Sequence, residues 1–356
     1  SAVLAHRNKY RDERGITEPE MIMAHTAHTA FRKGADYFGV KLIEAPVDPA
    51  TTQVDLDFVK KHINKNTVLL VGSAGNYPYG TIDPIKELSE LALKHDIGMH
   101  VDGCLGGFIL PYGEQLGYDI PVFDFRLPGV TSISADTHKY AYGPKGTSVV
   151  CYRDKSFRKY QYTTNPEWVG GTYVSPGIGG SRSGGIIAAT WAVMVTLGKE
   201  GYKERARKIF ETAYAMQEIV KKHPELRLMG SPSFCFSFTS DEFDIYHLND
   251  YMKDQGWRFN GQQYPSAIHM CVTGPQTQKG LVEEFEKDLA KAVVYAKNPA
   301  RTIASSGALY GGQGSKALTD FNDMEMIRTL MIEFMDDCLE QPDEWSPSPK
   351  KKLTDA

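Results

Sequence analysis

The chain has 356 residues, enough to bury a large core and to form two domains. Its net charge of −4, with 24% charged and 41% hydrophobic residues, is typical of a globular protein and argues against a nucleic-acid partner. The five cysteines lack a zinc-type spacing and no apolar run reaches the roughly 18 to 20 residues of a membrane span, so we expect reduced thiols, a cytosolic location, no metal and no transmembrane segment.

The first half of the chain alternates between predicted strands and helices. We expect strands at 21–24, 41–45, 67–72, 97–101 and at the start of 132–140, and helices at 30–38, at 55–63 and from Pro84 onward. This alternation continues to about residue 152 and predicts a mainly parallel sheet with right-handed crossovers. Ligands of such sheets bind at the carboxyl ends of the strands.

A long loop rich in Gly, Ser and Pro is predicted at 165–185, and its composition suggests a functional role. The apolar stretch 186–197, interrupted by Thr190 and Thr196, indicates a buried helix rather than a membrane span. A further helix is expected at 200–222 and leads into the second half of the chain.

The C-terminal half is predicted to be an α+β domain. Strands are expected near 226–238 and 267–273, and helices near 243–255, 278–297 and 324–339. We divide the chain into a large domain (1–198), a C-terminal α+β domain (199–340) and a disordered tail (341–356). The chain begins as an amphipathic helix without a preceding strand, so we expect the large domain to have a further N-terminal part upstream of Ser1.

Two predicted strands end in residues that could bind a cofactor or take part in catalysis. Asp102 follows an apolar strand, and Lys139, which is 37 residues later and is preceded by His138, follows another strand in the motif 132–140. A lysine amine can form a Schiff base with the aldehyde of pyridoxal phosphate, and a carboxylate can pair with its protonated pyridine nitrogen. A carboxylate at a buried strand end needs such a cationic partner. The two motifs together predict a site for pyridoxal phosphate.

The residues around Lys139 also carry a family resemblance. The segment 130–140, followed by Gly-Pro-Lys-Gly at 143–146, strongly resembles the sphingosine-1-phosphate lyases. Further similarity lies at 27–33, 100–108, 124–126, 175–182 and 308–311. Group II amino-acid decarboxylases usually have Asp-Pro-His-Lys where this chain has Asp-Thr-His-Lys. The resemblance implies an α/β chain of the fold-type I, pyridoxal-phosphate-dependent transferase-like class, with helices on both faces of a mainly parallel sheet and a smaller α+β C-terminal domain.

The resemblance also implies roles for individual residues. Lys139 resembles the lysine that holds the cofactor, Asp102 the partner of the pyridine nitrogen, and His28 the histidine that stacks on the ring. The remaining expected site residues are His138 and Ser181 at the cofactor phosphate, Lys145 and Tyr77 on the substrate side, and Ser73 at the phenolic oxygen. Structural roles stay open for His28 (core or cap), Ser73 (turn), Lys145 and Tyr77. Arg182 lies near the expected phosphate region without an assigned partner.

The activity implied is that of a carbon–carbon aldehyde-lyase. A phosphorylated long-chain base such as sphingosine 1-phosphate is cleaved by retro-aldol chemistry into a long-chain aldehyde and phosphoethanolamine. Lys139, Lys145 and the substrate phosphate are the alternatives for the base. The resemblance also implies a homodimer with shared active sites, in which Ser181 serves the neighbouring subunit.

Two other functions stay open: an amino-acid decarboxylase, and a non-catalytic fragment or paralogue. The residue before His138 is not proline, which argues against the decarboxylase. The Gly-Gly-Thr-Glu segment that cradles the cofactor phosphate in the family is expected just before Ser1, and its absence here is the best support for a non-catalytic chain. In a eukaryotic parent protein, an anchor still further upstream would place the enzyme at the cytosolic face of the endoplasmic reticulum.

Overall fold

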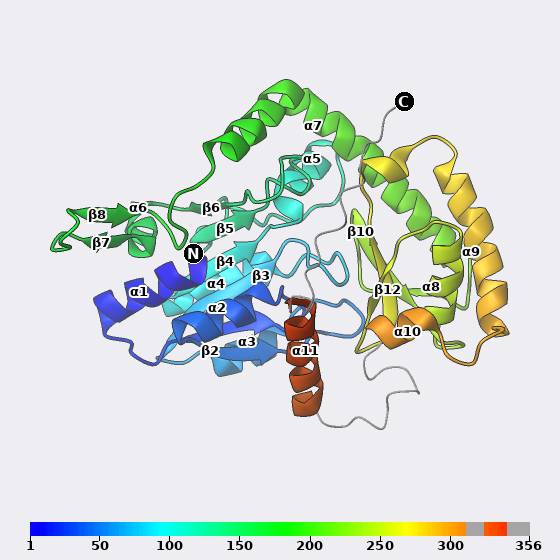
Figure 1. Ribbon diagram of the computed structural model, residues 1–356, viewed down its shortest axis with the longest axis horizontal. Helices are drawn as coiled ribbons and strands as arrows, with labels where there is room; N and C mark the ends of the chain where they lie inside the picture. Colours follow the sequence, from blue (N-terminus) through cyan, green and yellow to red (C-terminus); the bar gives the residue numbers. More distant parts are fainter. Residues whose placement is uncertain (311–323, 340–356) are drawn as a thin grey trace, which may run out of the picture.

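The large sheet contains six strands and is mainly parallel, as predicted. The computed structural model describes residues 1–310 and 324–339. The strands are β1 (Glu20–Ala24), β2 (Lys41–Ala45), β3 (Thr67–Ser73), β4 (Gly98–Asp102), β5 (Ser132–Ala135) and β6 (Val149–Tyr152). Their order is β2-β1-β3-β4-β5-β6; β1 to β5 are parallel, and β6 runs antiparallel to β5 (Figure 1).

Helices cover both faces of this sheet, which confirms the expected α/β architecture. The helices of this part are α1 (Ala2–Arg14), α2 (Ala30–Phe38), α3 (Leu56–His62), α4 (Ile85–His95) and α5 (Leu110–Gln115), with a short 3-10 turn, η1 (Gly106–Phe108). Alternate residues of a strand point to opposite faces. Met21 and Val71 therefore pack in the cluster with α1 and α2, whereas Ile22 and Leu70 pack in the cluster with α3 and α4. Every residue of β1, β3 and β4 is buried, as expected for a sheet covered on both sides.

The predicted loop 165–185 contains a small antiparallel ribbon that the sequence did not indicate. After α6 (Lys155–Arg158) and the 3-10 turn η2 (Lys159–Gln161), β7 (Thr163–Asn165) pairs with β8 (Tyr173–Ser175). Figure 1 shows this ribbon projecting from the body, away from the C-terminal half of the chain. The chain then enters the long helix α7 (Gly184–Lys221), which is interrupted by non-helical backbone at Gly198 (φ 57°, ψ −175°).

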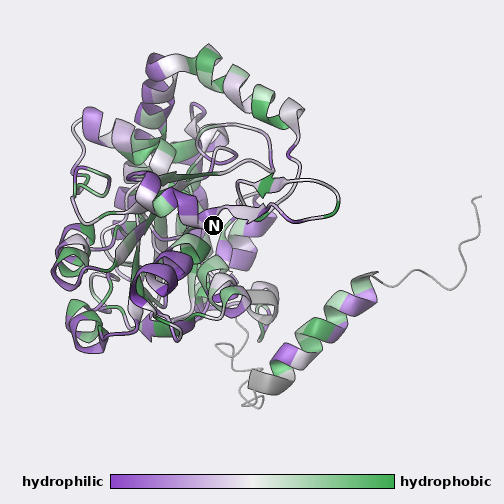
Figure 2. Ribbon diagram, turned by 90° about the vertical axis from the view of Figure 1, so that its left-hand side faces the viewer, coloured by the Kyte–Doolittle hydropathy of each residue, from purple (hydrophilic) through white to green (hydrophobic). Residues whose placement is uncertain are grey.

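The prediction of a buried helix at 186–197 is wrong for this chain on its own. Thr190 is buried, but Ile187 is 54% exposed, Trp191 66% and Val195 60%. The physical reason is the position of the helix. The half of α7 before Gly198 faces β6 across a cavity with one side, whereas the half after Gly198 packs on the core with Ile209, Phe210 and their neighbours. Figure 2 shows hydrophobic positions on this outer half of α7. An apolar sequence alone cannot tell burial in the core from burial by another chain.

The C-terminal half forms a four-stranded antiparallel sheet covered by helices, in agreement with the predicted α+β domain. The strands are β9 (Arg227–Leu228), β10 (Cys235–Thr239), β11 (Asn260–Gln262) and β12 (Ala267–Cys271), in the order β11-β12-β10-β9. The helices are α8 (Ile245–Asp254), α9 (Leu281–Lys297), α10 (Ser305–Tyr310) and α11 (Met324–Leu339), with a 3-10 turn, η3 (Gly274–Thr277). The division at residue 198 stays a prediction, and the tail 341–356 lies outside the described residues.

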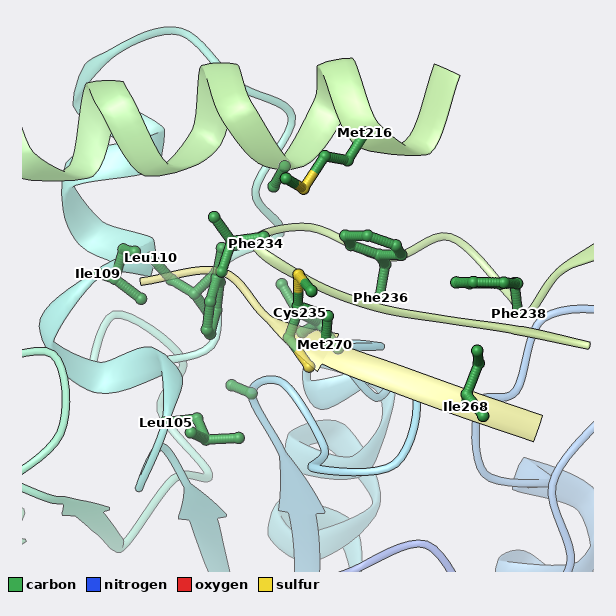
Figure 3. Close-up of a cluster of buried hydrophobic side chains, with 14 of the residues drawn as sticks. Leu105, Ile109, Leu110, Met216, Phe234, Cys235, Phe236, Phe238, Ile268 and Met270 are labelled. Carbon is green, nitrogen blue, oxygen red and sulfur yellow. The ribbon is translucent and has the colours of Figure 1, made fainter. Parts of the chain in front are cut away.

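The two sheets are joined by a continuous apolar core. Figure 3 shows Phe234 and Phe236 of the β10 region below Met216 of α7, Phe238 further along β10, and Leu105 and Leu110 on the side of the large sheet. All three phenylalanines are fully buried. Burying a side chain of this size contributes about 1.5–3 kcal/mol each, so the cluster holds the C-terminal sheet over the carboxyl ends of the parallel strands. Within the described residues, no helix is long and apolar enough to cross a membrane.

Candidate active site

A cavity of about 260 Å³ opens where the parallel strands end. Its lining includes Asp102 from the end of β4 and Lys139 from the turn that follows β5. The other chemically active side chains in the lining are His28, His100, Cys104, Ser134 and Asp136. Two motifs 37 residues apart thus meet in one site, because β4 and β5 are parallel neighbours and both run toward this edge.

Asp102 is buried and firmly oriented. In the sheet it lies beside Ser134 of β5 and Ser73 of β3. Its Oδ1 accepts hydrogen bonds from the Ser134 hydroxyl and from the backbone N–H of Cys104, both at 3.0 Å. These two donors fix the carboxylate while its second oxygen keeps capacity to accept from a ligand.

A directional hydrogen-bond chain supports Asp102 from behind. His100 contacts Ser132 through Nδ1 (2.7 Å) and Ser134 through Nε2 (3.1 Å). Burial, with smaller contributions from His6 and the N-terminus, lowers the pKa of His100 to about 3, so its ring is neutral and carries a single N–H. Since the Ser134 hydroxyl donates to Asp102, it must accept from His100 Nε2–H. Ser132 then donates to Nδ1. All the hydrogen bonds in this series from Ser132 to Asp102 therefore run in one direction, with the donor on the side of Ser132.

Lys139 is held by Asp136 three residues earlier. The two side chains form an ion pair, with Nζ 2.9 Å from Oδ2. Burial opposes the charged amine, but Cys104 and Asp136 outweigh it and raise the pKa of Lys139. Burial also raises the pKa of the Cys104 thiol to about 12, so at neutral pH this thiol is uncharged and Asp136 supplies the negative charge. The Lys139 side chain is therefore an ammonium ion in the cavity, paired with Asp136.

His28 fits both of the interpretations that the sequence left open. It lines the cavity, and its Nδ1 accepts the backbone N–H of Ala30 at 3.1 Å, which caps the start of α2. The capping contact orients the imidazole over the cavity that Lys139 and Asp102 share.

The remaining predicted site residues lie outside the lining of this cavity, and their roles stay predictions. Ser73 ends β3 next to Asp102, and its buried hydroxyl has no hydrogen-bond partner among the described residues. The His138 Nδ1 donates to the Thr147 carbonyl. Tyr77 packs against the ring of His269, with 4.3 Å between centroids. Lys145 and Ser181 are exposed on loops. Arg182 borders a second cavity of about 560 Å³ under the outer half of α7.

Sequence reasoning missed four residues that position the predicted pair: Asp136, Ser134, His100 and Cys104. Asp136 could have been found, since a carboxylate three residues before a lysine in a turn is close enough to pair with it. His100 and Ser134 have a weaker signal, because both lie two positions from another polar residue of the same strand and so face the same side. Their contact depends on the register of β4 with β5.

The site fits pyridoxal phosphate on its own geometry. It offers an amine, a fixed buried carboxylate and an imidazole around one cavity. At the same sheet edge, the buried hydroxyls of Ser73 and Thr137 have no partner among the described residues, as expected of groups that await a polar ligand. The volume of about 260 Å³ lies slightly below the roughly 300–1,000 Å³ of drug-sized ligand sites, which suits a single-ring cofactor.

Comparison with known proteins points the same way. The conserved domain of the pyridoxal-dependent decarboxylases matches residues 2–238. The chain is 45% identical over 337 residues to sphingosine-1-phosphate lyase of Oryza sativa and 44% identical to that of Arabidopsis thaliana, covering 94% of this chain in both cases. It spans about three fifths of the length of these relatives, 61% and 60%.

Solved structures give the same relationship at the level of coordinates. A sphingosine-1-phosphate lyase from Burkholderia pseudomallei superimposes with a TM-score of 0.87 at 56% identity, covering 96% of this chain and 72% of that one. A glutamate decarboxylase from Lactobacillus brevis superimposes with a TM-score of 0.71 at 21% identity, covering 85% of this chain and 72% of that one, which shows a shared fold alone.

Proposed function

Because this chain belongs to the sphingosine-1-phosphate lyases within the pyridoxal-dependent decarboxylase family, we propose that it cleaves phosphorylated long-chain bases to a long-chain aldehyde and phosphoethanolamine. The observation that carries the proposal is the meeting of Lys139 and Asp102 in one cavity, on the residues that resemble this family. The cofactor of the family is pyridoxal phosphate. When bound, it supplies an electron-withdrawing ring that accepts the electrons of the broken carbon–carbon bond.

Asp102 holds a proton at the pyridine nitrogen of that ring. The carboxylate suits this task because it is buried, and because Ser134 and the Cys104 backbone N–H keep one oxygen occupied. The chain of donors that starts at Ser132 ends at this carboxylate and keeps it from rotating. Electrostatic preorganisation of this kind requires no rearrangement during the reaction.

Lys139 would hold the cofactor through its side-chain amine. Only the neutral amine can form that bond, so the ammonium would first have to lose its proton. Asp136 lies 2.9 Å from Nζ and is the nearest charged acceptor in the site. The group that takes the substrate hydroxyl proton stays open between Lys139, Lys145 and the substrate phosphate.

The proposal is tested by incubating the full chain with pyridoxal phosphate and sphingosine 1-phosphate and assaying both products together. Equal amounts of aldehyde and phosphoethanolamine, lost in Lys139→Ala and kept in the surface control Lys94→Ala, are expected. Carbon dioxide released from an amino acid in place of these products would establish the decarboxylase alternative. A chain that forms no borohydride-reducible link between Lys139 and the cofactor would overturn the enzymatic role and favour the non-catalytic alternative.

We also propose a homodimer built on the exposed apolar surface of the outer half of α7 and the β7–β8 ribbon. The large exposed side chains of this surface are Trp168, Val169, Tyr173, Val174, Ile178, Ile187, Trp191 and Val195. Surfaces of this apolar character are rare on monomers and mark protein contacts. Ser181 lies on the loop between the ribbon and α7 and does not line the cavity of its own chain, which supports a role in the partner's site.

Subunit mixing tests the shared site. A Lys139→Ala subunit and a Ser181→Ala subunit are each defective, but a mixed dimer contains one site with both native residues. Activity that reappears on mixing supports the shared site, and mixtures that stay as inactive as their components contradict it. The cytosolic location and the association with the endoplasmic reticulum stay predictions.

A further inference from the structure

Two cysteines and a histidine converge between the strands of the C-terminal sheet. Cys235 lies on β10, and His269 and Cys271 lie on β12. One side-chain nitrogen or sulfur atom from each residue lies within 4.8 Å of the other two. Cys235 and His269 are fully buried, and Cys271 is half-buried. Figure 3 shows Cys235 on β10 facing the neighbouring strand β12 in the core.

The strand register explains why these residues meet. Cys235 and Cys271 are directly opposite each other in the antiparallel pair β10–β12. The next pair along, Phe234 and Val272, is hydrogen-bonded through the Val272 N–H (3.1 Å), so the cysteine pair occupies a non-hydrogen-bonded position, where opposing side chains approach most closely. His269 is two residues before Cys271 and therefore points to the same face of β12.

Two of the three ligand-atom distances in the cluster are close to those found around a zinc ion. The two Sγ atoms are 3.3 Å apart, and Cys235 Sγ is 3.8 Å from His269 Nδ1. With Zn–S bonds of about 2.3 Å and Zn–N bonds of about 2.0 Å, neighbouring ligand atoms of a tetrahedral site lie roughly 3.5–3.8 Å apart. The third pair, Cys271 and His269, has its ligand atoms within 4.8 Å of each other, so rotation of these side chains must bring them closer for all three to bind one ion.

We propose that Cys235, His269 and Cys271 bind one zinc ion, with the Tyr77 carbonyl oxygen or a water as the fourth ligand. The Cys235 Sγ lies 3.9 Å from the Tyr77 carbonyl oxygen, so that oxygen already faces the cluster. Binding releases the proton of each thiol to solvent, and the resulting Zn²⁺, two thiolates and neutral imidazole sum to zero charge. An uncharged assembly of this kind can be buried at low cost, unlike a bare cation.

A neighbouring residue completes the histidine side of the site. Asn260 Nδ2 lies 3.3 Å from His269 Nε2, and it holds the ring with Nδ1 toward the sulfurs. When Nδ1 binds the metal, the ring proton sits on Nε2, and Asn260 turns its amide over to accept this proton. Metal-binding histidines ordinarily have such a partner on the second nitrogen.

The bound ion links two parts of the molecule that are distant in sequence. Tyr77 belongs to the loop 74–81, which starts directly after β3, and its ring already packs on His269 at 4.3 Å between centroids. A metal bound by its carbonyl would tie this loop to β10 and β12. Soft thiolate ligands select zinc over magnesium or calcium, so the latter ions are not expected to bind here.

The site is tested on the full 356-residue chain, purified under reducing conditions, stripped with a chelator and then titrated with zinc. One zinc per chain is expected. Cys235→Ser, Cys271→Ser or His269→Gln should each weaken zinc binding more than about 100-fold, because loss of a residue that only hydrogen-bonds to a ligand already costs about 10–100-fold. Cys151→Ser, which removes an exposed cysteine outside the cluster, is the matched control and should bind like the original chain.

X-ray absorption at the zinc edge keeps the test independent of how the variants fold. Two sulfur neighbours near 2.3 Å and one nitrogen near 2.0 Å are expected for the original chain. No bound zinc, a shell of only nitrogen and oxygen, or binding that survives all three substitutions would overturn the proposal. A disulfide between Cys235 and Cys271 in the chain as isolated from reducing cells would also overturn it, because the ligands would then be consumed.

Discussion

Replacing Asp136 by Asn should lower the pKa of Lys139 and so increase the fraction of neutral amine. The ion pair is short, at 2.9 Å, and charge-assisted hydrogen bonds contribute about 1.5–3 kcal/mol. Lys139 is 27% exposed and Asp136 16%, so solvent screening reduces the effect to about 1–2 kcal/mol. Since about 1.4 kcal/mol is a factor of ten in an equilibrium, this loss corresponds to roughly ten times more neutral amine at pH 8.

The shift is measured by competitive labelling of the cofactor-free chain with acetic anhydride across pH, with peptide mass spectrometry at Lys139. Asparagine keeps an oxygen that can still accept the Ser148 hydroxyl, which bonds Asp136 at 2.6 Å, so the turn should be preserved. Asp124→Asn, which removes a carboxylate from the separate pair with Arg126, is the control and should leave Lys139 unchanged. A Lys139 pKa that stays constant or rises in Asp136→Asn would refute the assignment of Asp136 as the group that holds the ammonium.

Three other changes probe the supports of the site and the core. Ser134→Ala removes a donor to Asp102, so we expect about tenfold weaker binding of pyridoxal phosphate in an absorbance titration, and unchanged affinity would contradict the donor chain. Burial lowers the pKa of His6 to about 4, below the usual 6.5, so the stability that its neutral ring contributes is present above pH 6.5 and is lost as the pH falls toward 4. In His6→Gln, the free energy of unfolding should therefore fall less steeply with decreasing pH in this range, by up to about 1.4 kcal/mol per pH unit. An unaltered slope would contradict this. Gly80→Ala places a Cβ 1.8 Å from a backbone oxygen of β10, whereas the Cβ of Gly117→Ala meets no atom within 4 Å. Gly80→Ala should therefore lower the melting temperature more than Gly117→Ala does. Equal decreases would contradict the close packing at Gly80.

The alternating half of the fold could be predicted from the sequence because its strands and helices have strong local signals. The predicted helix 30–38 and strand 41–45 have the same bounds as α2 and β2. Short apolar runs mark strands covered on both faces, and Asp55 marks the start of α3 by accepting the N–H groups of Asp57 and Phe58. Lys139 and Asp102 could be placed at neighbouring strand ends for the same reason.

Contacts that depend on strand register could not be predicted. The spacing of Ser134 and His100 in sequence does not show that they bond; only the pairing of β4 with β5 does so. Cys235 and Cys271 are likewise separated by 36 positions and meet because two antiparallel strands pair at that register. Trp191 is apolar and exposed, and no rule based on local periodicity separates such a residue from one in the core.

The strand order of the large sheet also shapes the route by which the chain folds. From β1 to β5, neighbours in the sheet are closer in the chain than the two halves of the protein are, so each pairing closes a shorter loop and costs less entropy than contacts between the halves. The contact between Cys235 and Tyr77 spans 158 positions and must wait until the C-terminal half has been synthesised. A nascent chain can therefore form the sheet that carries Asp102 and Lys139 first. The C-terminal sheet packs on the loop 74–81 last. By the same logic, partial unfolding of the C-terminal sheet would uncover that loop while the parallel sheet remains intact.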